Sequence, residues 1–418
     1  MKIKEISEAI TKKYIILAYC VSGMGGGQMY TANKLVYMSE LGWEVKVVSF
    51  VGGTVIIPEL KQYENDIVCE ISNAPQIFSP RRREKIINLL ISMIGPFDEA
   101  IIESSNATMA LWGEILAKKL NCKHMVHLLC ENNQGVPEQY LDFYRFKHAR
   151  RELSGININS LKMLFRYSED INDENSYYLP SVCTNVVVPS EVDPIGIPKT
   201  GITMCCIGRL AKEYVMAAAS AFKSIVVAHT DELFNVLFIG DSDDEKIKNN
   251  IKAVFEDTQN VNLIMPGAVF PIPSSIFPKI SVFVSSAGSA NVSYRSNRPT
   301  ISIDARDLQA IGVLGYTTQN STYRKQEPQQ DIAELIEKII FQDYLSELMY
   351  TEPTPVSLAP LQLHVDFLNS SEKSKEYFPV DKMKAAGSDK KKRIIRILFG
   401  GKTYLQIRKV LLKLKKKR

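Results

Sequence analysis

The sequence lacks the features of disulfide-stapled, zinc-bound and membrane-spanning proteins. Its seven cysteines are scattered, with no CxxC pair and no histidine cluster at zinc spacing, which argues for a reducing cytoplasm and against a structural metal. No window reaches the roughly 18 apolar residues that cross a bilayer, and the apolar run at 14–20 is too short for a secretion signal. The hydrophobic content of 45% is ordinary for a folded protein, and 418 residues suggest two domains.

The net charge of +5 is distributed unevenly along the chain. Residues 381–418 hold 15 Lys and Arg against 2 Asp and Glu, which leaves a balance of −8 for the rest. Apolar residues recur there at spacings of three and four, interrupted by Gly400 and Gly401. This pattern predicts short cationic amphipathic helices that contact an anionic membrane surface through 390–418; a solvated or packed tail is the alternative. No nucleic-acid partner is expected, because the body has no basic stripe with interleaved aromatics.

Strand and helix patterns alternate twice along the chain. The first series predicts strands at 14–20, 43–50, 98–103, 124–129 and 185–188, and helices at 30–41, 82–93, 108–120 and 139–166. The second series, after the turn-rich segment 190–201, predicts strands at 202–207, 234–239, 260–265, 282–285 and 300–303, and helices at 214–229, 245–255 and 331–350. This alternation predicts two Rossmann-like α/β domains with doubly wound parallel sheets, at 1–195 and 200–350. Residues 351–380 are expected to cross back to the first domain, ahead of the tail at 381–418.

The stretch VSGMGGGQMY, residues 21–30, stands between the first strand and the first helix. Ligands of open α/β sheets bind at the carboxyl ends of the strands, where glycine lets the backbone approach and a helix N-terminus presents N–H groups to an anion. Gly25, Gly26 and Gly27 are therefore candidate ligand contacts, and a loop that needs positive φ is the alternative. The spacing does not match GxGxxG followed by an acidic residue, so a dinucleotide site is not predicted.

The order of the motifs resembles that of group 1 (family 4) glycosyltransferases, which have the GT-B fold. The opening strand, the GGGQ loop, a helix and LGWEVKVVSF resemble the start of that family, and IGRLAKEY resembles its GRL…K loop. Three later segments resemble the strands and helices that follow: NVLFIGDSDDEKIKNNI, NVNLIMPGAV and ISVFVSSAGSANVSYRSNRPTISID. The resemblance covers about residues 14–50 and 200–320.

The resemblance implies a nucleotide-sugar co-substrate, no cofactor and no metal. Two facing domains would hold the acceptor and the sugar nucleotide, with Gly25 to Gly27 against the donor. Arg209 and Lys212 would bind the diphosphate, which leaves with developing negative charge. The family's lysine usually stands two positions after Lys212, where this chain has Tyr214.

The two glutamates of the family's E-x7-E motif are absent. Small or polar residues stand near their places, and four of them are predicted to offer hydroxyl or N–H groups to the donor: Ser286, Gly288, Ser289 and Asn291. The alternative for the serines is an ordinary strand-to-helix turn with a capping role. The missing glutamates also leave open a catalytically silent subunit.

His127 and Glu131 are the candidate catalytic residues. Many relatives carry a histidine at the end of the matching strand, where it can bond a hydroxyl of the donor sugar; a structural histidine is the alternative. Glu131 or Glu103 could contact an acceptor hydroxyl. The acids Asp241, Asp243, Asp244, Asp304 and Asp307 are expected to be solvated or to favour helix starts, and no metal is predicted.

The main prediction is a retaining, hexosyltransferase-like glycosyltransferase of cell-surface polysaccharide synthesis. It would be cytoplasmic, peripheral on the inner face of the cell membrane, and would move a sugar from a nucleotide-sugar to a glycan or lipid-linked acceptor. Two alternatives remain. One is a silent GT-B scaffold for a partner transferase, and the other is a sugar-nucleotide epimerase of the same architecture, whose acid–base residues the sequence does not locate.

Overall fold

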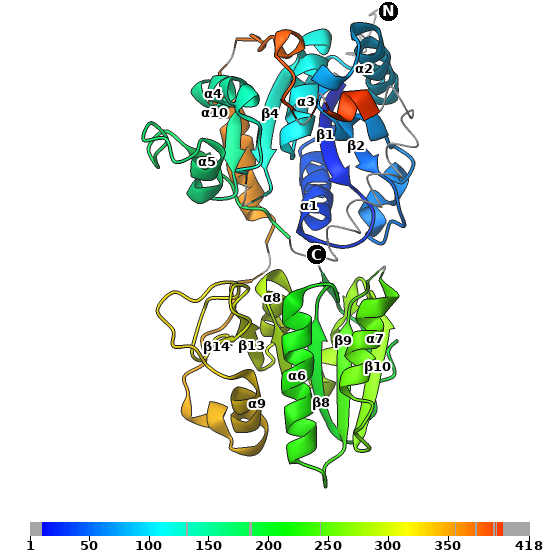
Figure 1. Cartoon of the computed structure of the whole chain (residues 1–418), viewed down its shortest axis with the longest axis vertical. Coiled ribbons are helices and arrows are strands. Elements are labelled where there is room, and N and C mark those ends of the chain that lie inside the picture. Colours follow the sequence, from blue (N-terminus) through cyan, green and yellow to red (C-terminus); the bar gives the residue numbers. More distant parts are fainter. Residues whose placement is uncertain are drawn as a thin grey trace, which may run out of the picture. The chain divides into compact units, whose positions relative to one another are not determined.

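The protein folds into two compact α/β units, seen in a computed structural model (Figure 1). The structure describes residues 11–130, 133–183, 186–242, 244–355, 357–372, 374–387, 389 and 391–395. Unit 1 comprises Met1–Thr184 and Leu358–Arg418, and unit 2 comprises Asn185–Ser357. The chain therefore returns to unit 1 after unit 2 is complete. Most of the predicted tail, 390 and 396–418, lies outside the described residues.

Unit 1 contains a six-stranded parallel sheet in the order β2-β1-β3-β4-β5-β6. The strands are β1 (Lys12–Cys20), β2 (Glu44–Val51), β3 (Glu99–Ser104), β4 (Lys123–Leu128), β5 (Leu153–Gly155) and β6 (Tyr177–Tyr178). The helices are α1 (Gly26–Glu40), α2 (Pro80–Ile94), α3 (Ala107–Leu120), α4 (Leu141–Ala149), α5 (Ile158–Leu164) and α10 (Gln362–Ser370).

The central strand β1 is buried on both faces, because helices cover both sides of the sheet. Ile15 and Leu17 pack with α2 and α3, whereas Tyr14 lies on the side of α1. Such a strand reads as a continuous apolar run, which is why it was recognisable in the sequence. Since β1 pairs with both β2 and β3, the chain reverses its direction of winding there, and ligand sites of open sheets occur at such points.

Unit 2 contains a second six-stranded sheet in the order β10-β9-β8-β12-β13-β14. Its strands are β8 (Ile202–Ile207), β9 (Phe234–Ile239), β10 (Val261–Gly267), β12 (Val282–Ser285), β13 (Thr300–Ile303) and the antiparallel β14 (Ala310–Val313), with β7 (Val187–Val188) and β11 (Ile272–Pro273) paired apart. Its helices are α6 (Glu213–Ala228), α7 (Glu245–Val254), α8 (Ala287–Arg295) and α9 (Ile332–Phe341). The switch of winding direction falls between β8 and β12.

The predicted fold class, two Rossmann-like α/β units, is confirmed, but several element predictions need correction. The stretch 139–166 is not one helix, because β5 interrupts it between α4 and α5. The helix expected at 331–350 ends at Phe341, and Asp343 soon after has a left-handed backbone, with φ of 51°. None of the described helices is long and apolar enough to cross a bilayer.

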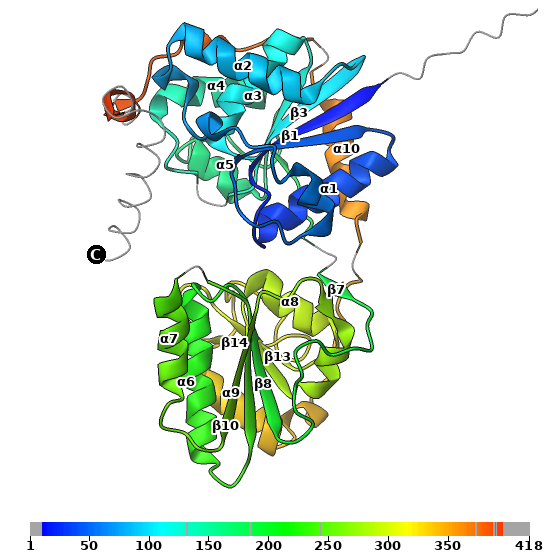
Figure 2. The ribbon, with the colours of Figure 1, turned by 90° about the vertical axis from the view of Figure 1, so that its right-hand side faces the viewer.

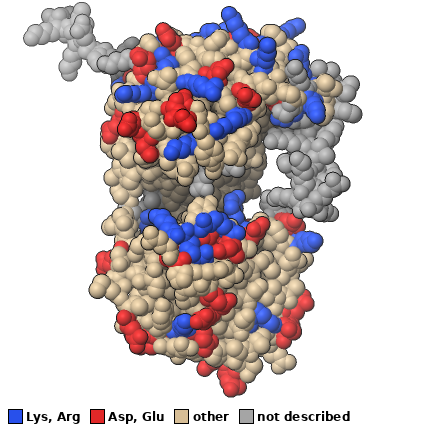
Figure 3. Space-filling model, turned by 60° about the vertical axis from the view of Figure 1, so that its left-hand side comes forward, with Lys and Arg blue, Asp and Glu red and all other residues tan. Residues whose placement is uncertain are grey.

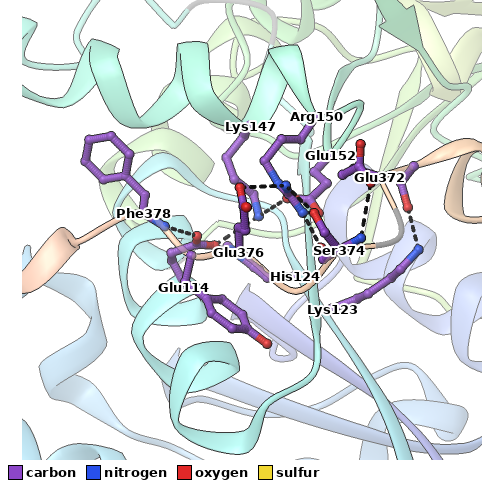
Figure 4. A network of polar contacts seen from close by, with 12 residues as sticks. Glu114, Lys123, His124, Lys147, Arg150, Glu152, Glu372, Ser374, Glu376 and Phe378 are labelled. Atoms are coloured by element: carbon purple, nitrogen blue, oxygen red, sulfur yellow. Dashed lines mark hydrogen bonds and ion pairs between the residues drawn. The ribbon is translucent and has the colours of Figure 1, made fainter.

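The returning segment is fixed to unit 1 by a buried network of charges (Figure 4). Glu114 of α3 accepts from the Lys147 ammonium at 2.9 Å and from the backbone N–H of Phe378 at 2.8 Å. Lys147 also bonds Glu152 at 2.6 Å, and Arg150 donates to Ser374. Hydrogen bonds from Arg150 and to Glu114, with an ion pair between Arg150 and Glu376, hold residues 374–378 against α3 and the end of α4.

Candidate functional site

In unit 2, the loops that follow β8 and β9 are packed backbone against backbone. A Cβ atom on Gly240 would lie 1.8 Å from the carbonyl oxygen of Gly208, and φ at the two glycines is 159° and 155°. Only glycine fits such a contact. The Gly208 N–H donates to the carbonyl of Ile239, and the Leu210 N–H donates to the carbonyl of Asp241. Backbone hydrogen bonds to the end of β9 and its loop therefore fix the turn that carries Arg209.

Tyr214 packs against this turn. The sequence alone did not indicate a role for it. Its hydroxyl donates to the carbonyl of Ile207 at 3.2 Å and occupies the space where a side chain on Gly208 would be. Burial raises the pKa of Tyr214, while a hydrogen bond with Ser289 and the charge of Arg209 oppose the rise. Ser285, at the end of β12, also exchanges hydrogen bonds with Ile207, so the start of α8 lies beside the turn that carries Arg209. The only sequence signal was that an aromatic residue replaces the family's lysine.

The N-terminus of α8 lies at the carboxyl end of β12 and has no side-chain cap. Ser286 occupies the cap position, but its hydroxyl donates to Ile303 at 2.8 Å instead of capping the helix. The Ala287 N–H donates to Ser321, whereas the N–H groups of Gly288 and Ser289 have no acceptor among the described residues. Gly288 is exposed, and a Cβ there would meet no atom within 4 Å. Open N–H groups at a helix start attract anions.

The backbone of this turn is strained at one residue. Ala287 has φ of 54°, in the left-handed region that costs an L-residue roughly 1 kcal/mol. Strained positions of this kind gather at functional sites. The alternative prediction of an ordinary capped turn is thus wrong for Ser286, which is bonded elsewhere.

The other predicted donor contacts of unit 2 differ in exposure. Arg209 and Lys212 are exposed, and neither forms an ion pair with a described residue. Lys212 is the N-cap of α6, while Asn291 is half-buried and donates to Ser321 at 3.2 Å. Arg209, Gly288 and Ser289 therefore remain the residues best placed to bind an anion.

Asp304 is not a solvated acid, contrary to expectation, whereas Asp307 is exposed as expected and forms an ion pair with Arg324. The Asp304 side chain is fully buried and accepts from Arg306 and from the backbone N–H of Arg324, and Arg324 also donates to Asp307 at 2.7 Å. The Arg306 guanidinium lowers the pKa of Asp304. Figure 3 shows Lys, Arg, Asp and Glu side chains crowded at this end of unit 2. The acids shape the loop after β13 and leave no free carboxylate there.

Asp241 and Asp244 also have structural partners. Asp241 pairs with Lys248 at 2.9 Å, and Asp244 caps α7 by accepting from Lys246 N–H at 3.1 Å, as expected of an acid at a helix start. Asp243 and the predicted catalytic Glu131 lie outside the described residues.

In unit 1, the three glycines end the loop after β1, where the sequence placed them. Gly25 is the N-cap of α1 with an extended backbone, and Gly26 and Gly27 begin the helix. Positive φ is therefore not the reason for these glycines; Gly23 is the loop residue with φ of 70°. A Cβ on Gly27 would meet no atom within 4 Å, so this helix start is open as well.

A buried polar cluster lies beneath that loop, built by β1, α1, β3, β4 and the returning α10. Its members are Tyr14, Tyr30, Lys34, Glu103, His127 and His364. Glu103 accepts from the hydroxyls of Tyr14 and Tyr30, the latter at 2.7 Å, and lies 3.5 Å from the Lys34 ammonium. Sequence reasoning considered only Glu103 and His127; Lys34 lies among the buried residues of α1, which include the polar Thr31 and Asn33, so no sequence signal singled it out.

His127 has one ring nitrogen without a partner. Nδ1 lies 3.0 Å from the Ser154 hydroxyl, which donates to the Val126 carbonyl. Nδ1–H therefore donates to Ser154, and the lone pair is on Nε2. That atom is buried and has no hydrogen-bond partner among the described residues. A buried orphan nitrogen is unfavourable unless a ligand uses it.

The charge states within this cluster follow from its burial. Burial lowers the pKa of His127 to about 4 and that of His364 to about 3, so both rings are neutral at pH 7. Burial, the largest single effect, would raise the pKa of Glu103, but the Lys34 charge, the neighbouring histidine rings and the Tyr14 hydrogen bond together outweigh it and bring the value to about 2. Burial and Glu103 raise the pKa of Tyr14 and Tyr30, which stay protonated as donors.

Comparison with known proteins identifies the type of fold. The sequence matches no protein-family model and no curated protein. A putative UDP-N-acetylglucosamine 2-epimerase from Listeria monocytogenes matches in structure with a TM-score of 0.50 and 10% identity, over 89% of this chain and 100% of that one. Anabaena Alr3699/HepE, solved with UDP and glucose, matches with a TM-score of 0.51 and 11% identity, over 86% and 95%. The same Anabaena protein with UDP-glucose matches with a TM-score of 0.50 and 10% identity, over 92% and 99%.

These matches show a GT-B-type fold and correct the prediction of function. No family model supports membership of the family 4 glycosyltransferases, so only the GT-B-type fold stands. The glycosyltransferase assignment is wrong as the main assignment, because the structure matched over nearly the whole chain is described as that of a putative epimerase.

Proposed function

We propose that this chain is an enzyme that binds a UDP-sugar in unit 2 and acts as a sugar-nucleotide epimerase. The observation that carries the proposal is the uncapped start of α8, where the N–H groups of Gly288 and Ser289 are open, beside the turn that carries Arg209. The printed descriptions of the structural matches, an epimerase and a protein solved with UDP-glucose, support the same ligand class.

The chemistry of a nucleotide diphosphate suits this part of unit 2. Its two phosphates carry negative charge that backbone N–H groups and a guanidinium stabilise through charge-assisted hydrogen bonds. Asn291 stands near where a family glutamate would bind ribose, and its half-buried amide can donate to or accept from a hydroxyl. No metal is needed for such binding, and none is part of the proposal.

Epimerisation breaks a C–H bond of the sugar ring and restores it on the opposite face, so one group must take a proton and one must return it. Exchange of that hydrogen with solvent is therefore the signature of the reaction, and it can be followed separately from UDP binding.

Two measurements test the proposal. UDP binding is measured by calorimetry with the full chain and with Arg209→Ala, which is expected to bind about 10- to 100-fold more weakly because a charge-assisted bond is lost. Lys248→Ala, which removes a cation of unit 2 that is paired with Asp241, is the control and should bind as the unchanged chain does.

Epimerase activity is measured by NMR in D₂O with UDP-N-acetylglucosamine. Formation of the C2 epimer with deuterium at the inverted carbon is expected, and Arg209→Ala should slow it in step with its weaker UDP binding. His229→Gln removes a ring that is paired with Glu337 in unit 2 and should keep the activity. UDP binding without any deuterium uptake would overturn the epimerase assignment and leave only a nucleotide-sugar-binding protein.

A further inference from the structure

A groove on unit 1, away from the polar cluster, combines cations with an unsatisfied acceptor. It has a volume of about 550 Å³ and is formed by residues 76–83, at the start of α2, and by residues 381–385, 393 and 394 of the returning segment. The Arg83 guanidinium donates to the carbonyl of Asp381 at 3.2 Å, which joins its two walls. Figure 2 shows the end of the described chain, in red, beside α2.

The groove is cationic. Arg83, Lys384 and Arg393 line it against a single acid, Asp381. Neither Lys384 nor Arg393 forms a hydrogen bond or ion pair with any residue that the structure describes. These cations are thus available to an anionic ligand.

The position of the arginines in α2 is unfavourable for the helix itself. Arg81, Arg82 and Arg83 occupy its first turn, which has no acidic residue. Positive charge at a helix N-terminus opposes the helix dipole, by about 0.3–1 kcal/mol for each residue. Arg82 is compensated by its ion pair with Glu70, whereas Arg83 lines the groove, where a bound anion would compensate it.

Gln76 gives the groove a second, independent sign of a ligand. Its side chain is only 7% exposed, and its Nε2 donates to the Val380 carbonyl at 2.9 Å, which fixes the orientation of the amide. Its Oε1 is buried without a partner among the described residues, although Gln76 lines the groove. A buried acceptor without a donor costs about 1–3 kcal/mol, which a hydroxyl of a bound molecule would offset.

The remaining walls are apolar. Phe78, Pro80, Met383 and Ile394 line the groove, and Ile394 is 58% exposed. By sequence, residues 396–418 add nine Lys and Arg and no acid. Together these features fit a phosphate ester that carries both a hydroxyl and an apolar chain, adjacent to further positive charge.

We propose that this groove binds the headgroup of an anionic phospholipid that bears a hydroxyl, of the phosphatidylglycerol type. Arg83, Lys384 and Arg393 contact the phosphate, Gln76 Oε1 accepts from the headgroup hydroxyl, and the apolar wall meets the upper part of the acyl chains. Unit 1 then docks on an anionic membrane surface through this groove. The site is independent of the nucleotide site in unit 2.

The test is flotation of the full chain with phosphatidylcholine vesicles, with and without phosphatidylglycerol. The double variant Arg83→Gln/Lys384→Gln is expected to bind the anionic vesicles roughly 30-fold more weakly, since each basic residue near the surface contributes about 1 kcal/mol. The double variant Lys118→Gln/Arg145→Gln loses two exposed charges elsewhere in unit 1 and should bind like the unchanged chain. Equal binding by both double variants would overturn the groove as the site.

Two further measurements distinguish a lipid headgroup from a soluble phosphate ester as the ligand of the groove. Gln76→Met is expected to lose the preference for phosphatidylglycerol over phosphatidic acid vesicles of equal charge, with its melting temperature recorded to confirm folding. Calorimetry with glycerol phosphate should show no binding; binding as tight as that to vesicles would overturn the lipid assignment in favour of a soluble phosphate ester. UDP binding should be the same in all of these groove variants. A negative result for the lipid site can therefore be distinguished from a negative result for the proposed UDP-sugar function.

Discussion

Lys34 and Glu103 form an ion pair of 3.5 Å although their side chains are only 1% and 3% exposed. The pair joins α1 to β3 directly beneath the glycine loop of unit 1. Tyr14 and Tyr30 donate to the same carboxylate, so the buried negative charge is well satisfied. Because removing both ions at once can be nearly neutral whereas removing one is costly, this pair offers a clear test of the cluster.

Glu103→Gln should destabilise the protein by about 3–5 kcal/mol, because it leaves the Lys34 ammonium buried without a counter-ion. The free energy of unfolding in urea measures this. The double variant Lys34→Met/Glu103→Gln removes both charges and should lose much less. A single variant as stable as the unchanged protein would show that Lys34 is not held charged in this cluster.

Stability should fall as the pH is lowered from about 6.5 towards 4, because of the two buried histidines. Folding lowers the pKa of His127 from 6.5 to about 4 and that of His364 to about 3. The unfolded chain therefore binds more protons in this range, and stability is full above 6.5 and is lost as the pH falls through the folded values. The His127 contribution is on the order of 3 kcal/mol.

The measurement is urea unfolding of the full chain between pH 4 and 8. In His127→Gln the slope of stability against pH should be visibly flatter over this window. His148→Gln, at a half-buried ring of α4, provides a comparison that should retain most of the slope. An unchanged slope in His127→Gln would refute the assignment of a neutral buried ring.

Ala287→Gly should stabilise unit 2 by up to about 1 kcal/mol, because it relieves the left-handed φ of 54°. The expected gain is small, since glycine also increases the entropy of the unfolded chain. Thermal unfolding measures it. Clear destabilisation would mean that the Ala287 methyl group makes contacts worth more than the strain.

Glu114→Gln should loosen the returning segment. The variant weakens the bonds from Lys147 and from the Phe378 N–H, so amide hydrogen exchange at 374–380 should speed up by at least about tenfold. Exchange in β8 and β9 of unit 2 serves as the internal reference. If exchange at 374–380 stayed at its original rate, packing and not this network would be what holds the segment.

The alternation of apolar strands with helices was enough to predict both sheets, because a parallel strand buried on two faces leaves a continuous apolar run. Strands β5 and β6, with three and two residues, were missed because they are too short to show a period. The length of α9 was overestimated because no glycine or proline in the sequence marks the helix end, where Asp343 has a left-handed backbone.

The candidate site was predictable from the sequence only where glycines or polar residues directly follow a predicted strand. The glycines at 25–27 and the polar turn at 286–291 both follow strands, so their places could be read from the sequence. The cluster around Glu103 could not, because it depends on His364, which reaches His127 across more than two hundred residues and packs its ring 5.0 Å from that ring. Similarly, the role of Tyr214 follows from a contact with Gly208 that no motif records.

The central claim, that unit 2 binds a nucleotide diphosphate at the start of α8, is tested most directly at Gly288. A Cβ at Gly288 meets open space, so Gly288→Leu should fold normally yet fill the position of the phosphates. Calorimetry with UDP should show binding to the unchanged chain, and to Gly135→Leu, whose glycine also faces open space in unit 1. The account predicts that Gly288→Leu loses that binding by about a hundredfold or more, and UDP binding that is unaffected by this leucine would contradict it.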